Sequence, residues 1–195
     1  DDTIGTLSEK FKRKINIKIF SGDKDFAQLV DKNVSIINPI TLNVMDREGV
    51  KEKFDVNPEN IIDYLALQGD KSDNIPGVPG VGKKTASRLI NKYGDVECII
   101  NKKDDIPGKV GGLIKSNIEQ LRLSKILATI KLDVEIPEKL EDLVKYKSKK
   151  DELIKIYERL ELNSFLKSEN LEKNSDLQIV VSKETKRELI KNFNI

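Results

Sequence analysis

The stretch from 69 to 88 constrains the chain most, because it joins an acidic turn to a glycine-rich turn and a helix start. It reads Gly-Asp-Lys-Ser-Asp-Asn-Ile-Pro-Gly-Val-Pro-Gly-Val-Gly-Lys-Lys-Thr-Ala-Ser-Arg. The carboxylates of Asp70 and Asp73 can hold a hard metal ion, and free N–H groups at a helix start beside Lys83 and Lys84 can hold a phosphate. The combination indicates phosphodiester chemistry on a nucleic acid. An acidic turn followed by a capped surface helix is the alternative, and this stretch alone does not decide between them.

The glycine-rich turn nearly fits the phosphate loop of nucleotide hydrolases, but two features argue against ATP binding. Lys84 stands where that loop needs a metal-binding hydroxyl, and the turn follows a helix and an acidic turn instead of a buried strand. A helix–hairpin–helix explains the pattern better, since glycines allow close approach to a DNA backbone and the next helix start holds a phosphate. Such contacts are independent of sequence and sensitive to salt. The residues expected to bind DNA are Gly77, Gly80, Gly82, Lys83, Lys84, Thr85, Ser87 and Arg88.

The order of expected elements predicts an α/β part that leads into an all-helical part. Helix 1–11, strand 15–20, a helix over 26–30 and strand 34–37 suit an α/β sheet, followed by a short helix over 46–54. From there to 130 only helices are expected, at 57–68, 83–92 and 96–101 and as one or two helices over 106–130. Helix 151–162, a polar linker over 168–175, a strand at 177–181 and a helix over 184–193 complete the chain. The predicted domains are a nuclease core over 1–56, a helical DNA-binding subdomain over 57–167, and a linker with the truncated start of another domain over 168–195.

Three pairs of aspartates lie at the ends of these elements, where their side chains can converge. Like charges gathered at one place need cations to neutralise them, and two divalent ions would cleave a phosphodiester in line. With 33 acidic residues in 195, ordinary caps and turns are the alternative explanation. The candidate ligands are Asp1, Asp2, Asp23, Asp25, Asp70 and Asp73.

Composition excludes several other classes of site. The chain has no histidine and one cysteine, so zinc sites with His ligands, a His base, a Ser-His-Asp triad and an intrachain disulfide are ruled out. Cys98, in an apolar run, is expected to be a small core residue. The net charge of +2 is too small to indicate nucleic-acid binding by itself. An argument for such binding must rest on a local separation of positive and negative charges. No apolar stretch approaches the ~20 residues that cross a bilayer, and we expect a cytoplasmic protein.

Four segments together resemble the 5′-nuclease domain of bacterial DNA polymerase I, in the flap endonuclease superfamily. They are residues 1–7, Ser-Gly-Asp-Lys-Asp-Phe-Ala-Gln-Leu-Val at 21–30, the long run over 63–86, and 127–131. The resemblance covers roughly 1–167. It implies a PIN-like or resolvase-like α/β core followed by a helix–three-turn–helix. It also implies a structure-specific 5′–3′ exonuclease and flap endonuclease that uses two Mg²⁺ or Mn²⁺ ions and removes RNA primers and flaps.

The resemblance further implies the roles of individual residues and the partner. The six aspartates match the family's metal ligands, and the hairpin Gly77–Lys84 matches the segment that grips duplex DNA and in many members holds K⁺. The expected partner is double-stranded DNA with a 5′ flap or nick, bound by a monomer without a nucleotide cofactor. Part of the family's domain, including further acidic ligands, would precede Asp1, so we expect an active parent nuclease and a poorly active fragment. A non-catalytic DNA-binding module is the alternative.

Overall fold

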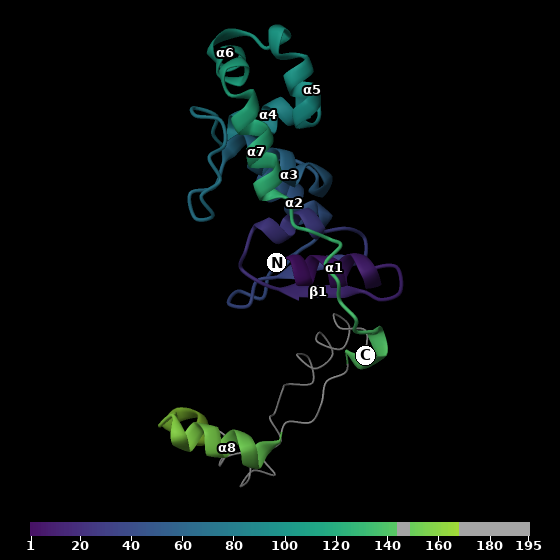
Figure 1. The fold of residues 1–195 in the computed structure, drawn as a ribbon, viewed down its shortest axis with the longest axis vertical. Coiled ribbons are helices and arrows are strands. Elements are labelled where there is room, and N and C mark those ends of the chain that lie inside the picture. The colour runs from purple at the N-terminus through teal and green to yellow at the C-terminus, as the bar shows by residue number, and fades with distance from the viewer. Residues whose placement is uncertain (144–148, 168–195) are drawn as a thin grey trace. The chain divides into compact units, whose positions relative to one another are not determined.

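The computed structural model describes residues 1–143 and 149–167, and the chain divides into two compact units, Asp1–Leu140 and Glu141–Ile195. The first unit begins with α1 (Asp2–Phe11), β1 (Ile17–Phe20), the 3-10 helix η1 (Asp25–Leu29) and β2 (Val34–Ile37). A short strand β3 (Val44–Met45) and α2 (Arg47–Phe54) follow. Figure 1 shows α1 and β1 at one end of this unit and the later helices grouped at the other.

The sheet has the order β1-β2-β3 and positions the acidic loop that follows its first strand. β1 and β2 are parallel, with Ile19 opposite Ile36, and β3 runs antiparallel to β2. Ile19, Val34 and Ile36 are buried, so one face of the sheet packs against the core. Because ligand sites in such sheets lie at the carboxyl ends of parallel strands, the loop after β1 is placed where a site is expected.

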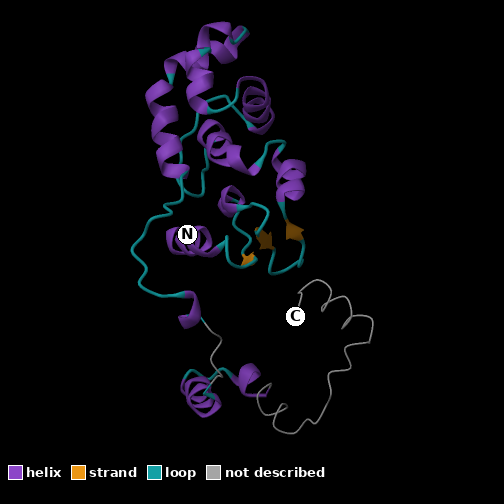
Figure 2. Ribbon diagram, turned by 90° about the vertical axis from the view of Figure 1, so that its right-hand side faces the viewer, coloured by secondary structure: helices purple, strands orange, loops and turns teal. Residues whose placement is uncertain are grey.

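The helical part begins with η2 (Pro58–Asn60) and is built around α3 (Ile61–Gln68), which packs against both α4 (Lys83–Tyr93) and α7 (Ile118–Ala128). Five consecutive residues of α3, from Asp63 to Leu67, are buried, because neighbours cover the helix on several sides. The remaining elements are α5 (Val96–Asn101), η3 (Lys103–Asp105) and α6 (Gly108–Ser116). Figure 2 shows these helices stacked beyond the short strands.

The expected elements agree closely with this fold, with a few corrections. The helix expected over 26–30 is the 3-10 helix η1, and the helix expected over 57–68 begins as the 3-10 helix η2 before α3. The strand β3 was not predicted because two residues give no periodic signal. The region 106–130 forms two helices, one of the two outcomes expected. Cys98 was expected in the core but is exposed, since α5 turns Val96, Ile99 and Ile100 inward instead. Apolar periodicity alone does not say which residues of so short a helix face out.

The second unit contains α8 (Lys150–Arg159), where a helix over 151–162 was expected. The rings of Tyr157 and Phe165 stack with centroids 5.3 Å apart. The predicted linker, strand and helix between 168 and 195 lie outside the described residues.

Candidate metal centre and nucleic-acid interface

Three of the six predicted carboxylates lie together. Asp25, Asp70 and Asp73 each offer an oxygen within 4.8 Å of the other two, and we call this group the acidic triangle. Asp25 opens η1 just beyond β1. Asp70 is fixed by paired backbone hydrogen bonds with Ile75, each 2.8 Å long, which close the turn that carries Asp73. The carboxyl end of β1 and the turn after α3 thus supply the triangle.

Asp25 is the most constrained member of the triangle. The residue is 9% exposed, and its Oδ1 atom is buried without a hydrogen-bond partner. Burial, reinforced by the negative charge of Asp23, raises the pKa of Asp25 from 3.8 to about 6. A buried carboxylate oxygen with no donor is costly, and a bound cation would relieve that cost.

Asp70, in contrast to Asp25, accepts hydrogen bonds at both of its carboxylate oxygens. Its Oδ1 accepts hydrogen bonds from the backbone N–H of Ser72 at 2.8 Å and from the Ser72 hydroxyl at 2.6 Å, while its Oδ2 contacts the ammonium of Lys24. Although burial alone would raise its pKa, these donors lower the pKa of Asp70 to about 2. Asp70 is therefore ionised at neutral pH.

The triangle fits a hard divalent ion. All of its possible metal ligands are carboxylate oxygens, which Mg²⁺ and Mn²⁺ prefer. Asp25 Oδ1 accepts no hydrogen bond that a metal ion would have to replace. The two groups that sequence reasoning missed are Lys24 and Ser72. Each lies between the two aspartates of a predicted pair, and this position in the sequence could have indicated that it contacts them.

The other three predicted ligands lie outside the triangle. Asp23 is exposed, and its Oδ1 accepts a hydrogen bond of 2.9 Å from the backbone N–H of Asp25, so it orders the loop. Asp1 is the N-cap of α1, and Asp2 accepts a hydrogen bond of 3.0 Å from the backbone N–H of Lys131. Their metal-binding role stays a prediction.

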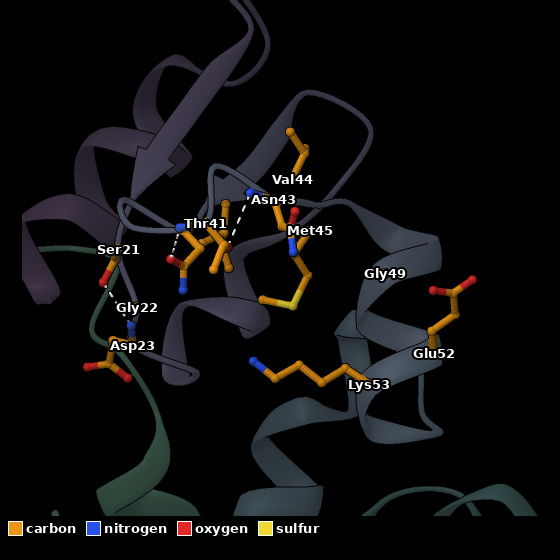
Figure 3. A pocket seen from close by; sticks show the side chains of 12 residues that line it. Ser21, Gly22, Asp23, Thr41, Asn43, Val44, Met45, Gly49, Glu52 and Lys53 are labelled. Atoms are coloured by element: carbon orange, nitrogen blue, oxygen red, sulfur yellow. Dashed lines mark hydrogen bonds between the residues drawn. The ribbon is translucent and has the colours of Figure 1, made fainter.

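A polar pocket of about 300 Å³ lies between the loop after β1, the β2–β3 turn and α2. Figure 3 shows Lys53 extending into the pocket and Glu52 pointing away from it. Of the six predicted ligands, only Asp23 lines it. The three carboxylates of the triangle therefore do not line this pocket.

Two hydrogen bonds connect the glycine-rich hairpin, residues 76–82, to α7. The backbone N–H of Gly77 donates to the Ser124 hydroxyl at 3.0 Å, and the Gln120 side chain donates to the Gly77 carbonyl at 2.7 Å. Gly77 has φ +61° and Gly80 φ +86°, conformations that favour glycine. Gly82 is the N-cap of α4, with φ −98° and no side-chain cap.

Most of the predicted DNA-binding side chains are on the surface of α4. Lys83, Lys84 and Arg88 are exposed and form no ion pair with any described residue. Thr85 is half-buried. Ser87 is 4% exposed, and its hydroxyl donates to the Lys84 carbonyl at 3.4 Å. Because Ser87 is buried, its side chain is not placed to contact DNA.

Replacing Ser124 with alanine tests the support beneath the hairpin. Ser124 is fully buried, so the variant leaves the Gly77 N–H without its partner and should lower the free energy of unfolding by about 1–3 kcal/mol. Urea denaturation measures the change. Ser116→Ala, in which an exposed hydroxyl is lost, is the control and should change stability by less than about 0.5 kcal/mol.

Two family models account for most of the described chain. The N-terminal resolvase-like domain of 5′-3′ exonucleases matches residues 1–55, and the C-terminal SAM fold of 5′-3′ exonucleases matches residues 56–152. The chain belongs to the 5′-3′ exonuclease family. The predicted fold class, a resolvase-like α/β core with a helical helix–hairpin–helix part, is confirmed by these matches.

Relatives in this family include DNA polymerase I of Pseudomonas aeruginosa, 44% identical over 85% of this chain and 19% of that protein. The 5′-3′ exonuclease of Aquifex aeolicus is 43% identical over 86% of this chain and 57% of that protein. The chain thus spans between about a fifth and three fifths of these two curated relatives.

A solved structure of the bacteriophage T5 flap endonuclease, a pseudo-enzyme–product complex with DNA and metal ions, has the same fold. It superposes with a TM-score of 0.61 at 26% identity, over 67% of this chain and 48% of the T5 chain. Among the residues that the structure describes, no helix of this chain is both long and apolar enough to cross a membrane.

Proposed function

We propose that the protein is a metal-dependent 5′–3′ exonuclease and flap endonuclease that hydrolyses phosphodiesters of DNA or RNA primers, as part of a DNA polymerase I in replication and repair. The observation that carries this proposal is the acidic triangle with its unpartnered, buried Asp25 Oδ1, in a chain that belongs to the 5′-3′ exonuclease family. The T5 structure, which holds metal ions and DNA, supports it.

The metals we propose are two Mg²⁺ or Mn²⁺ ions. When bound, they supply Lewis-acid catalysis for phosphodiester hydrolysis. Asp25, Asp70 and Asp73 would hold one ion, and Asp23, Asp1 and Asp2 are the proposed further ligands. The protein's own contribution is to hold these oxygens in place, through the Asp70–Ile75 backbone pair and the Ser72 hydrogen bonds.

The hairpin and the start of α4 are proposed to hold the duplex. The uncapped first turn of α4 can donate N–H groups to a phosphate, and Lys83, Lys84 and Arg88 add positive charge beside it. Gly82 leaves open space at the same helix start, so a DNA backbone can approach closely. The proposed partner is double-stranded DNA with a 5′ flap or nick, bound by a monomer, with K⁺ at the hairpin.

The proposed domains separate the part of the chain that binds metal from the part that binds DNA. Residues 1–56 form the part of the nuclease core that carries Asp25, and residues 57–167 form the helical DNA-binding subdomain.

Cleavage of a 5′-labelled flap duplex tests the proposed chemistry. For the full-length polymerase we expect cleavage in Mg²⁺, none in EDTA, and a loss of more than roughly 100-fold in the Asp73→Asn variant, because a metal ligand becomes a neutral amide. Residues 1–195 alone are expected to cleave poorly. Cleavage by Asp73→Asn at the unchanged rate would contradict the ligand assignment. DNA binding without cleavage by the full-length wild type would favour the non-catalytic module instead.

Removing Lys83 and Lys84 together tests the interface. In the double alanine variant we expect duplex affinity to fall roughly tenfold and the slope of log K against log salt to become shallower by about 2, since two phosphate contacts are lost. Fluorescence anisotropy over a salt series measures both. The control is the double variant Lys32→Ala with Lys51→Ala, which removes two exposed lysines of the α/β part. If both double variants weaken binding equally, the hairpin assignment fails.

A further inference from the structure

Lys24 is the positive charge that touches the acidic triangle. It lies between Asp23 and Asp25 in the loop after β1, and its ammonium contacts Oδ2 of Asp70, a carboxylate whose side chain is 5% exposed. The Lys24 side chain itself is 33% exposed. The contact therefore joins a buried acid to a lysine that reaches in from the solvent side.

Both carboxylate oxygens of Asp70 accept hydrogen bonds. Both hydrogen bonds from Ser72 go to Oδ1, at 2.8 and 2.6 Å, and Lys24 covers Oδ2. Asp25 Oδ1, by contrast, has no partner. An ion that enters the triangle therefore has to compete with Lys24 for Asp70, whereas no hydrogen bond holds Asp25 Oδ1.

A metal ion and the Lys24 ammonium cannot share Asp70 Oδ2 at low cost. Sharing would place a divalent ion and an ammonium within a few ångströms of each other, and like charges at that distance repel. The ammonium can leave, because a lysine stem is flexible and its head is readily hydrated. In the partly exposed loop, water can take over its solvation.

We propose that Lys24 is a stand-in cation, which neutralises the acidic triangle in the metal-free protein and must leave Asp70 when a divalent ion binds. Lys24 therefore lowers the metal affinity of the site without being a ligand. This inference rests on the proposed function, since it assumes that the triangle holds the metal. It predicts that removing Lys24 strengthens metal binding although the lysine stabilises the empty site.

Calorimetric titration of the full chain with Mn²⁺ tests the inference. In Lys24→Met, which keeps the stem and removes the charge, we expect Mn²⁺ to bind about tenfold more tightly, because no ammonium has to be displaced. Thermal unfolding in EDTA should show a lower melting temperature for the same variant. Lys24→Arg, which keeps the charge and can grip Asp70 through two donors, should bind Mn²⁺ no more tightly than the wild type.

Lys71→Met is the matched control, since Lys71 is exposed and adjoins Asp70 in sequence, and no ion pair joins it to the triangle within the described residues. Its affinity should stay within about twofold of the wild type. Equal strengthening in both Met variants would overturn the inference by showing a general charge effect, and so would unchanged or weaker binding by Lys24→Met.

The same titrations separate this inference from the proposed metal site. If Asp25→Asn loses the Mn²⁺ binding of the wild type while Lys24→Met equals the wild type, the site stands and the role of Lys24 falls. If the wild type binds no Mn²⁺, both are wrong.

Discussion

Replacing Gly77 with alanine should destabilise the protein by about 3 kcal/mol or more. A Cβ atom at this position would lie 2.4 Å from the backbone nitrogen of Gly69 and 2.6 Å from its Cα, and the residue has φ +61°. Neither neighbour is the end of a flexible side chain, so the hairpin and the end of α3 would have to separate. Because Asp70 directly follows Gly69, the acidic triangle would be disturbed too.

Gly82→Ala is the matched control in the same hairpin. Its Cβ would meet nothing within 4 Å and its backbone, at φ −98°, suits any residue. We expect its free energy of unfolding, measured in urea, to stay within about 1 kcal/mol of the wild type, while its affinity for duplex DNA falls because the methyl group occupies the approach to α4. Equal stability of the two variants would contradict the close packing of Gly77 on Gly69.

The second large effect is expected for Asp25→Asn, which should lose divalent-metal binding and gain stability in EDTA. The metal is lost because the variant removes the buried carboxylate of the triangle. The gain arises because burial and the charge of Asp23 disfavour an ionised Asp25 in the folded state. A pKa raised from 3.8 to about 6 corresponds to at most about 3 kcal/mol, and we expect about 1–2, since the amide is also buried.

The direction of the pH dependence gives a further check on this variant. Between about pH 4 and pH 6 the folded metal-free protein holds a proton on Asp25 that the unfolded chain has released, so stability contributed by Asp25 falls as the pH rises through this window. Asp25→Asn should lack this fall. Chemical denaturation in EDTA across the window measures it, with Glu52→Gln as a control on an exposed acid of the polar pocket. If Asp25→Asn binds Mn²⁺ as the wild type does, or is destabilised in EDTA, our account of the triangle is wrong.

The order of elements was predictable because its signals are local. Asn57-Pro58 and the Gly94 stop mark helix ends, and the helices found at α4 and α5 lie where caps and apolar spacing predicted them. The strand β3 and the outward turn of Cys98 were not predictable, because both depend on tertiary neighbours rather than on periodicity.

The candidate site was predictable as a set of residues but not as a geometry. Aspartates at the ends of elements indicated a metal site, yet only distances could separate the three that converge from Asp1, Asp2 and Asp23. The roles of Lys24 and Ser72 depend on which oxygen of Asp70 each one contacts, and sequence does not encode that in any local pattern. The burial of Ser87 likewise follows from how α4 packs.

A crystal structure of the protein soaked in Mn²⁺, with anomalous scattering recorded, tests the central claim most directly. We predict an anomalous peak coordinated by oxygens of Asp25, Asp70 and Asp73, with the Lys24 ammonium no longer in contact with Asp70 Oδ2. No peak at these three carboxylates, or a peak at other residues alone, would contradict the claim that the acidic triangle is the metal centre of the protein.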